Sequence, residues 1–111
     1  MTNKEHDPHE PINYILSNRR KAAEAKGRLA GLEAYKSSLR AILMKKSNEQ
    51  SLGAQEREAL ASQEYQDLCK AIGIATEQKE ALRWQLEAAK MRFEAWRTQQ
   101  ANDRNLERLT R

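Results

Sequence analysis

Cysteine, proline, glycine and aromatic residues are all scarce in this sequence. Its 111 residues include one Cys, two Pro and four Gly, and aromatic residues make up 5%. The lone Cys69 cannot form an internal disulfide bond, and no second Cys supplies the spacing of a zinc site. Because no stretch alternates apolar and polar residues over the length of a strand, the sequence predicts an all-α protein built from long helices.

The sequence also has no long apolar run. No segment approaches the roughly 18 apolar residues of a membrane-spanning helix, and the first ten residues are polar. The two histidines, His6 and His9, have no Cys nearby to complete a metal site. We therefore expect no membrane span, no signal peptide, no metal and no cofactor, and we expect a cytoplasmic location.

Charged residues, by contrast, are abundant at 32%, and the net charge is +4. The segment 19–46 holds nine Lys or Arg against only Glu24 and Glu33. One interpretation is a solvated helix face, and the other is a surface for an anionic partner such as nucleic acid. The candidate nucleic-acid contacts are Arg19, Arg20, Lys21, Lys26, Arg28 and Arg40.

Apolar residues recur every three or four positions in both halves of the chain, which is the pattern of packed helices. In the first half this seam comprises Ile15, Ala22, Ala25, Leu29, Leu32, Leu39 and Leu43. In the second half it comprises Tyr65, Leu68, Ile72, Ala75, Leu82, Leu86, Ala89, Phe93 and Trp96, and Lys79 alone interrupts it.

These two helices with a short connection predict a long antiparallel helical hairpin that resembles a coiled coil. Matching the helix ends places Leu43 near Leu68, Leu29 near Leu82, and Ile15 near Phe93 and Trp96. Ser62 is placed to cap the second helix. The expected organisation is a disordered lead-in at 1–10, a hairpin at 11–98 and a fraying basic overhang at 99–111; the hairpin comprises a helix at 11–46, a connection at 47–62 with a short helix at 54–60, and a helix at 63–98 or beyond.

A second apolar series lies on the opposite face of the later helix, and a face of small residues lies on the first helix. A helix with two apolar faces needs a neighbour on each. We therefore predict a homodimer that forms a four-helix bundle. The alternative is that the short helix at 54–60 folds over Trp84. The predicted interface residues are Ala81, Trp84, Ala88, Met91 and Ala95 on one face and Gly27, Gly31 and Ala34 on the other.

No combination of residues in the chain points to catalysis. There is no phosphate-binding glycine loop, no His paired with a nucleophile and no HExxH motif. Glu77, Glu80, Glu87 and Glu94 lie on one predicted helix, but no His follows them at the spacing of a di-iron site. We therefore expect a protein that is not an enzyme.

The region 54–104 carries a distinctive spacing of aromatic, Ala and Arg residues. It comprises Ala54-Gln55-Glu56-Arg57-Glu58-Ala59, Tyr65, Leu82-Arg83-Trp84, Ala88-Ala89, Arg92, Glu94, Trp96-Arg97, Ala101 and Arg104. This spacing resembles a group of small uncharacterised phage and prophage proteins, which are encoded among phage recombination and single-strand annealing genes. Where that group often has Asp-Pro before the Tyr helix, this chain has Ser62-Gln63. The resemblance implies a helical hairpin and carries over no catalytic residue.

Three functional hypotheses follow from these patterns. The leading one is a phage accessory protein of DNA recombination or replication that binds a partner protein, DNA or both. The second is a phage inhibitor that docks on a host nuclease or defence complex. The third is a structural oligomeric scaffold. The basic first helix favours a location near DNA and argues against mimicry of DNA by acidic residues.

Overall fold

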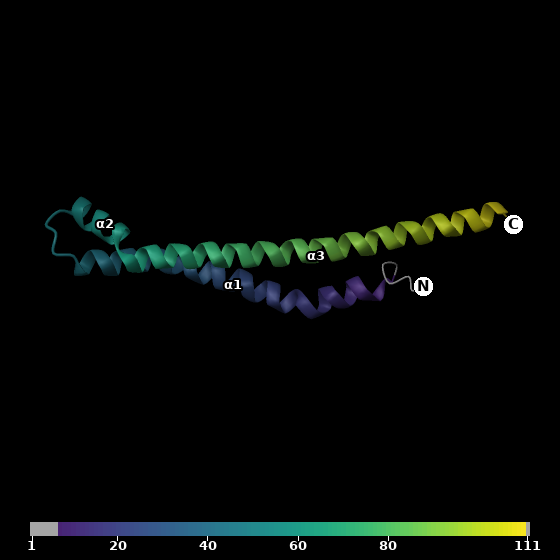
Figure 1. The fold of residues 1–111 in the computed structure, drawn as a ribbon, viewed down its shortest axis with the longest axis horizontal. Helices are drawn as coiled ribbons and strands as arrows, with labels where there is room; N and C mark the ends of the chain where they lie inside the picture. The colour runs from purple at the N-terminus through teal and green to yellow at the C-terminus, as the bar shows by residue number, and fades with distance from the viewer. Residues whose placement is uncertain (1–6, 111) are drawn as a thin grey trace. The chain divides into compact units, whose positions relative to one another are not determined.

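The computed structural model describes residues 7–110, and this part of the chain contains α-helices and no strand. Figure 1 shows the three helices in chain order: α1 (His9–Lys46), α2 (Leu52–Ala61) and α3 (Gln63–Thr110). The all-α prediction is therefore confirmed, and the connection between the two long helices does contain a short helix.

Helix α1 begins earlier than the sequence predicted. The Asp7 Oδ1 atom accepts a hydrogen bond from the backbone N–H of His9 at 2.9 Å, which is the geometry of an N-cap. Pro8 lies between them, in the first turn, where a missing N–H costs little. Of the predicted lead-in at 1–10, residues 1–6 lie outside the described part of the chain, and His9 and Glu10 already belong to α1.

Two serines define the start and the end of α2. The Ser51 side chain accepts from the Ala54 N–H and caps the helix start. At the other end, the Ser62 N–H donates to the Ala59 carbonyl, while the Ser62 hydroxyl accepts from the Tyr65 N–H at 3.2 Å. Ser62 therefore ends α2 and caps α3, and its predicted role as an N-cap is confirmed.

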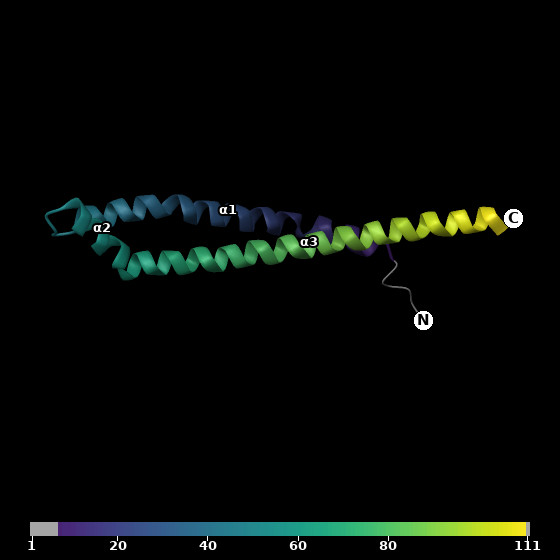
Figure 2. The ribbon, with the colours of Figure 1, turned by 90° about the horizontal axis from the view of Figure 1, so that it is seen from above.

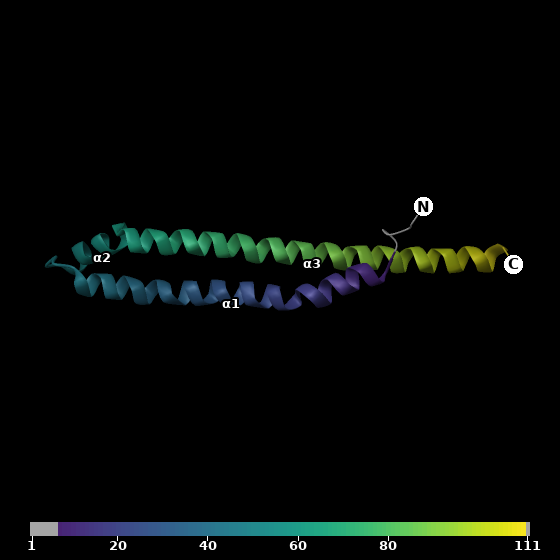
Figure 3. The same cartoon turned by 60° about the horizontal axis from the view of Figure 1, so that its bottom comes forward.

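The chain divides into two compact units. The connection unit is Ala23–Glu80, and the terminal unit combines Met1–Ala22 with Ala81–Arg111. Within the connection unit, α1 and α3 run antiparallel and side by side, as Figures 2 and 3 both show. Arg28 donates to the Gln78 side chain at 2.9 Å, and the Lys36 ammonium lies 6.0 Å from the centre of the Tyr65 ring.

The predicted α3 seam faces inward along its whole length. Every seam residue from Tyr65 to Trp96, including Lys79, is buried or half-buried. The buried apolar residues are nevertheless small and few, and no large side chain in the described part of the chain is fully buried. The buried hydrophobic residues are Ala25, Leu29, Leu39, Ala59, Leu68, Ala75 and Ala89.

The pairing register of α1 and α3 differs from the one obtained by matching helix ends. That matching placed Lys36 beside Ala75, but Lys36 lies over Tyr65, which is more than two turns earlier along α3. The cause is α2, which packs against the last turns of α1. Glu56 pairs with Arg40 at 3.3 Å, and Glu58 accepts from the Ser47 hydroxyl at 2.9 Å. As a result, the start of α3 lies beside the part of α1 near Lys36, ten residues before α1 ends at Lys46.

In the terminal unit, α1 and α3 are joined by the Tyr14 hydroxyl, which donates to Gln85 Oε1 at 2.6 Å. Ala89 is fully buried, with 0% exposure. End matching places Ile15 near Phe93 and Trp96, but its neighbour Tyr14 meets α3 at Gln85, eight residues before Phe93. Trp96 is therefore only half-buried.

Helix α3 includes the segment that the sequence predicts to fray. The helix continues to Thr110, although residues 102–110 are all exposed. Side-chain hydrogen bonds one turn apart support it, from Gln99 to Asp103 at 3.1 Å and from Arg108 to Asn105 at 3.2 Å. Such pairs stabilise exposed helices by a few tenths of a kcal/mol each, about 0.2–0.5 kcal/mol.

Candidate interaction face

Helix α3 presents an apolar face to solvent, which we call the tryptophan face. It is defined by Ala81, Trp84, Ala88, Met91 and Ala95, all of them exposed. The two large members, Trp84 and Met91, are 59% and 65% exposed. A single exposed apolar residue is ordinary on a protein surface, whereas a row of them at helical spacing is typical of a surface that packs on another protein.

Ile74 extends this series and was missed by the sequence analysis. It is 57% exposed and precedes Trp84 by ten residues, with Ala81 between them. Spacings of seven and then three residues keep it in the same heptad pattern. This spacing is visible in the sequence. However, the charged residue Glu77 occupies the position of the row between Ile74 and Ala81, so the apolar series identified from the sequence begins only at Ala81.

Within residues 7–110, Trp84 remains 59% exposed. The Arg83 guanidinium lies 4.5 Å from the centre of the Trp84 ring, which is a cation–π contact that leaves most of the indole in solvent. Helix α2 is bonded instead to the end of α1 through Glu56 and Glu58. These contacts of α2 give no support to the alternative in which the short helix folds over Trp84.

On α1, Gly27, Gly31 and Ala34 are exposed as well. A Cβ atom built on Gly27 or Gly31 would meet no atom within 4 Å. Packing within the chain therefore does not require glycine at either position. Glycine in a helix interior costs roughly 1 kcal/mol relative to alanine, so these two residues weaken α1 without a compensating contact inside the described chain.

The candidate nucleic-acid residues of α1 do not form one free basic surface. Arg28 donates to Gln78, Arg40 pairs with Glu56, and Arg20 also has a partner within the chain. Half of the six candidates thus contribute to contacts within the chain. The others, Arg19, Lys21 and Lys26, are exposed.

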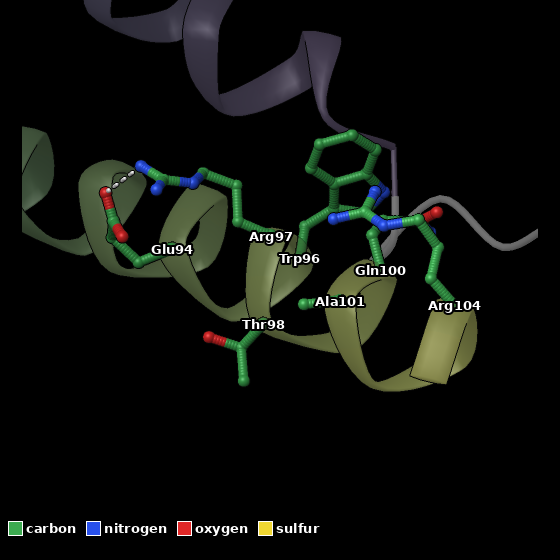
Figure 4. A pocket seen from close by; sticks show the side chains of 7 residues that line it. All are labelled: Glu94, Trp96, Arg97, Thr98, Gln100, Ala101 and Arg104. Carbon is green, nitrogen blue, oxygen red and sulfur yellow. Dashed lines mark hydrogen bonds and ion pairs between the residues drawn. The ribbon is translucent and has the colours of Figure 1, made fainter. Parts of the chain in front are cut away.

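A shallow hollow of about 340 Å³ lies on the terminal unit beside α3. Figure 4 shows its side chains, with Trp96, Arg97 and Arg104 extending to one side of the helix and Thr98 to the other. Arg97 reaches back to Glu94 Oε1 at 3.4 Å. The lining residues are Glu94, Trp96, Arg97, Thr98, Gln100, Ala101 and Arg104.

The described residues contain no group of three or more His, Cys, Asp or Glu side chains that could hold a metal ion. None of the helices described has the length and apolarity needed to cross a membrane. The candidate sites on the described part of the chain are the tryptophan face, the glycine positions of α1 and the arginine-lined hollow. No known protein family, curated protein or solved structure matches the chain.

Proposed function

We propose that this chain is a non-enzymatic interaction protein whose tryptophan face binds a second copy, which gives a homodimeric four-helix bundle. The exposure of Trp84 and Met91 on one face of α3 carries this proposal. Large aromatic side chains dominate the energy of protein interfaces when a partner excludes water from them. The small face at Gly27, Gly31 and Ala34 offers a complementary shape, because large side chains of one copy can approach its backbone closely.

A thin core made largely of alanine favours association, because small scaffolds with little buried area often depend on oligomerisation.

Sedimentation equilibrium tests the dimer directly. The wild-type chain should sediment with twice the monomer mass, and Trp84→Ala should shift it toward the monomer with unchanged far-ultraviolet circular dichroism. The matched control is Leu52→Ala, which removes a large apolar side chain that is 74% exposed on α2, outside the tryptophan face. A wild-type chain that stays monomeric at high micromolar concentration would show that the face serves a different protein.

We further propose that the dimer acts in the cytoplasm of a phage-infected host cell, as an accessory protein of DNA recombination or replication. The support is the sequence resemblance of 54–104 together with the three exposed cations Arg19, Lys21 and Lys26. Capture from infected-cell extract, with and without nuclease treatment, tests this role. Capture of a recombination protein that depends on DNA supports it, and a stoichiometric complex with a host nuclease would instead identify an inhibitor.

A further inference from the structure

The hollow beside α3 places an aromatic ring among cations. Trp96 is half-buried, so part of its indole is accessible, and it stacks on Phe93 with the ring centres 6.0 Å apart. Phe93 therefore holds the indole in place. A fixed, partly exposed indole is a stacking platform for planar groups such as the bases of single-stranded nucleic acids.

Arg97 and Arg104 supply positive charge on either side of this platform. They are seven residues apart on α3, which corresponds to about 10 Å along the helix axis. Flexible arginine side chains over this distance can contact neighbouring phosphates of one strand. Figure 4 shows both guanidinium groups on the same side of α3 as the Trp96 indole.

Neither arginine is firmly engaged within the chain. Arg104 has no hydrogen bond or ion pair with any described residue. Arg97 pairs with Glu94, but the two side chains are 62% and 64% exposed. An ion pair that is open to water contributes little and is readily exchanged for a phosphate. The small Ala101 between the arginines leaves space above the helix for a bound strand.

We infer that this hollow binds single-stranded nucleic acid. One base stacks on Trp96, and the flanking phosphates contact Arg97 and Arg104. A duplex does not fit this arrangement, because its bases already stack on one another and cannot reach the indole. The site lies away from the tryptophan face and is independent of self-association, so each can fail without the other.

Binding of a short fluorescein-labelled oligothymidylate, followed by anisotropy at low and moderate salt, tests the site. The double variant Arg97→Gln/Arg104→Gln should weaken binding about tenfold or more and lower the salt slope by about 1.4, since each lost phosphate contact to a single strand lowers it by about 0.7. The matched control Arg92→Gln/Arg108→Gln removes two charges from the same helix outside the hollow, and its affinity should fall by clearly less.

Stacking is tested separately through fluorescence. Trp84→Phe leaves Trp96 as the only tryptophan, and oligothymidylate should then quench its emission. Unlabelled duplex of the same length should compete poorly. Undetectable binding at low salt, unchanged Trp96 emission on saturation, or equal loss in the control variant would each overturn the site; the last result would place binding on the general charge of the chain.

Discussion

Alanine supplies half of the buried side chains in the part of the chain that the structure describes. Four of the seven buried hydrophobic residues are Ala, and Ala89 is the most completely enclosed. A small side chain at the contact allows two helix backbones to approach closely, so there is little room to accommodate a larger one. The tolerance of each alanine should therefore depend strongly on which face of α3 it occupies.

Two adjacent alanines test this dependence. Ala89→Leu should destabilise the chain by about 1–3 kcal/mol, because the added atoms overpack the contact. Ala88→Leu, one residue earlier and exposed, should change the free energy of unfolding by less than about 0.5 kcal/mol. Urea unfolding followed by circular dichroism, at a protein concentration too low for association, measures both. Equal losses at the two positions would contradict the placement of the seam.

At the scale of the elements, the glycines of the long helices separate stability from association. A Cβ at Gly27, Gly31 or Gly73 would meet nothing within 4 Å. Replacement by alanine should therefore stabilise the isolated chain at each position by roughly 0.5–1 kcal/mol, because alanine loses less backbone entropy in a helix.

The same substitutions should differ in their effect on self-association. Gly27→Ala places a methyl group on the small face that we assign to the dimer contact, so it should weaken association while it raises the stability of the monomer. Gly73→Ala lies on α3, away from the small face of α1, and serves as the control for the gain in stability alone. Thermal unfolding of dilute protein and sedimentation equilibrium of concentrated protein measure the two effects. Association that is unchanged by Gly27→Ala would remove this face from the interface.

The sequence was sufficient to identify the helices and their inward faces, because heptad spacing and the capping role of Ser62 are local properties. It did not determine the register of α1 against α3. A seam that repeats every seven residues packs almost equally well after a shift of one repeat. The choice depends on where α2 docks, and that contact is made by Arg40, Glu56, Ser47 and Glu58, which lie outside the seam.

The same limit applies to the candidate sites. The tryptophan face follows from spacing alone, and only Ile74 was missed. The hollow could not be predicted, because the register obtained by matching helix ends places both Phe93 and Trp96 against Ile15. The exposed Arg104 became relevant only when α3 was found to continue to Thr110.

At the scale of the whole molecule, the proposed dimer links stability to concentration. A partner that binds only the folded chain raises the unfolding temperature, and the effect grows with protein concentration. Differential scanning calorimetry of the wild-type chain should show a Tm that increases over a dilution series. Trp84→Ala should show a Tm that does not change with dilution, and Leu52→Ala should behave like the wild type. A wild-type Tm without concentration dependence would argue against the dimer.

The short connection at 47–50 joins α1 to α2 and α3, and side chains of α1 contact both of these helices. Tyr14 binds Gln85, Arg28 binds Gln78 and Arg40 binds Glu56, and each of these contacts crosses from one side of the connection to the other. Helix α1 carries nine Lys or Arg and three Glu, whereas α2 and α3 together carry nine Lys or Arg and ten Asp or Glu. A covalent link holds two such parts at an effective concentration in the millimolar range. Cleavage of the chain at this connection would thus give a basic peptide and a nearly neutral peptide. Without the covalent link, the two peptides would stay together as a heterodimer only through their affinity for each other.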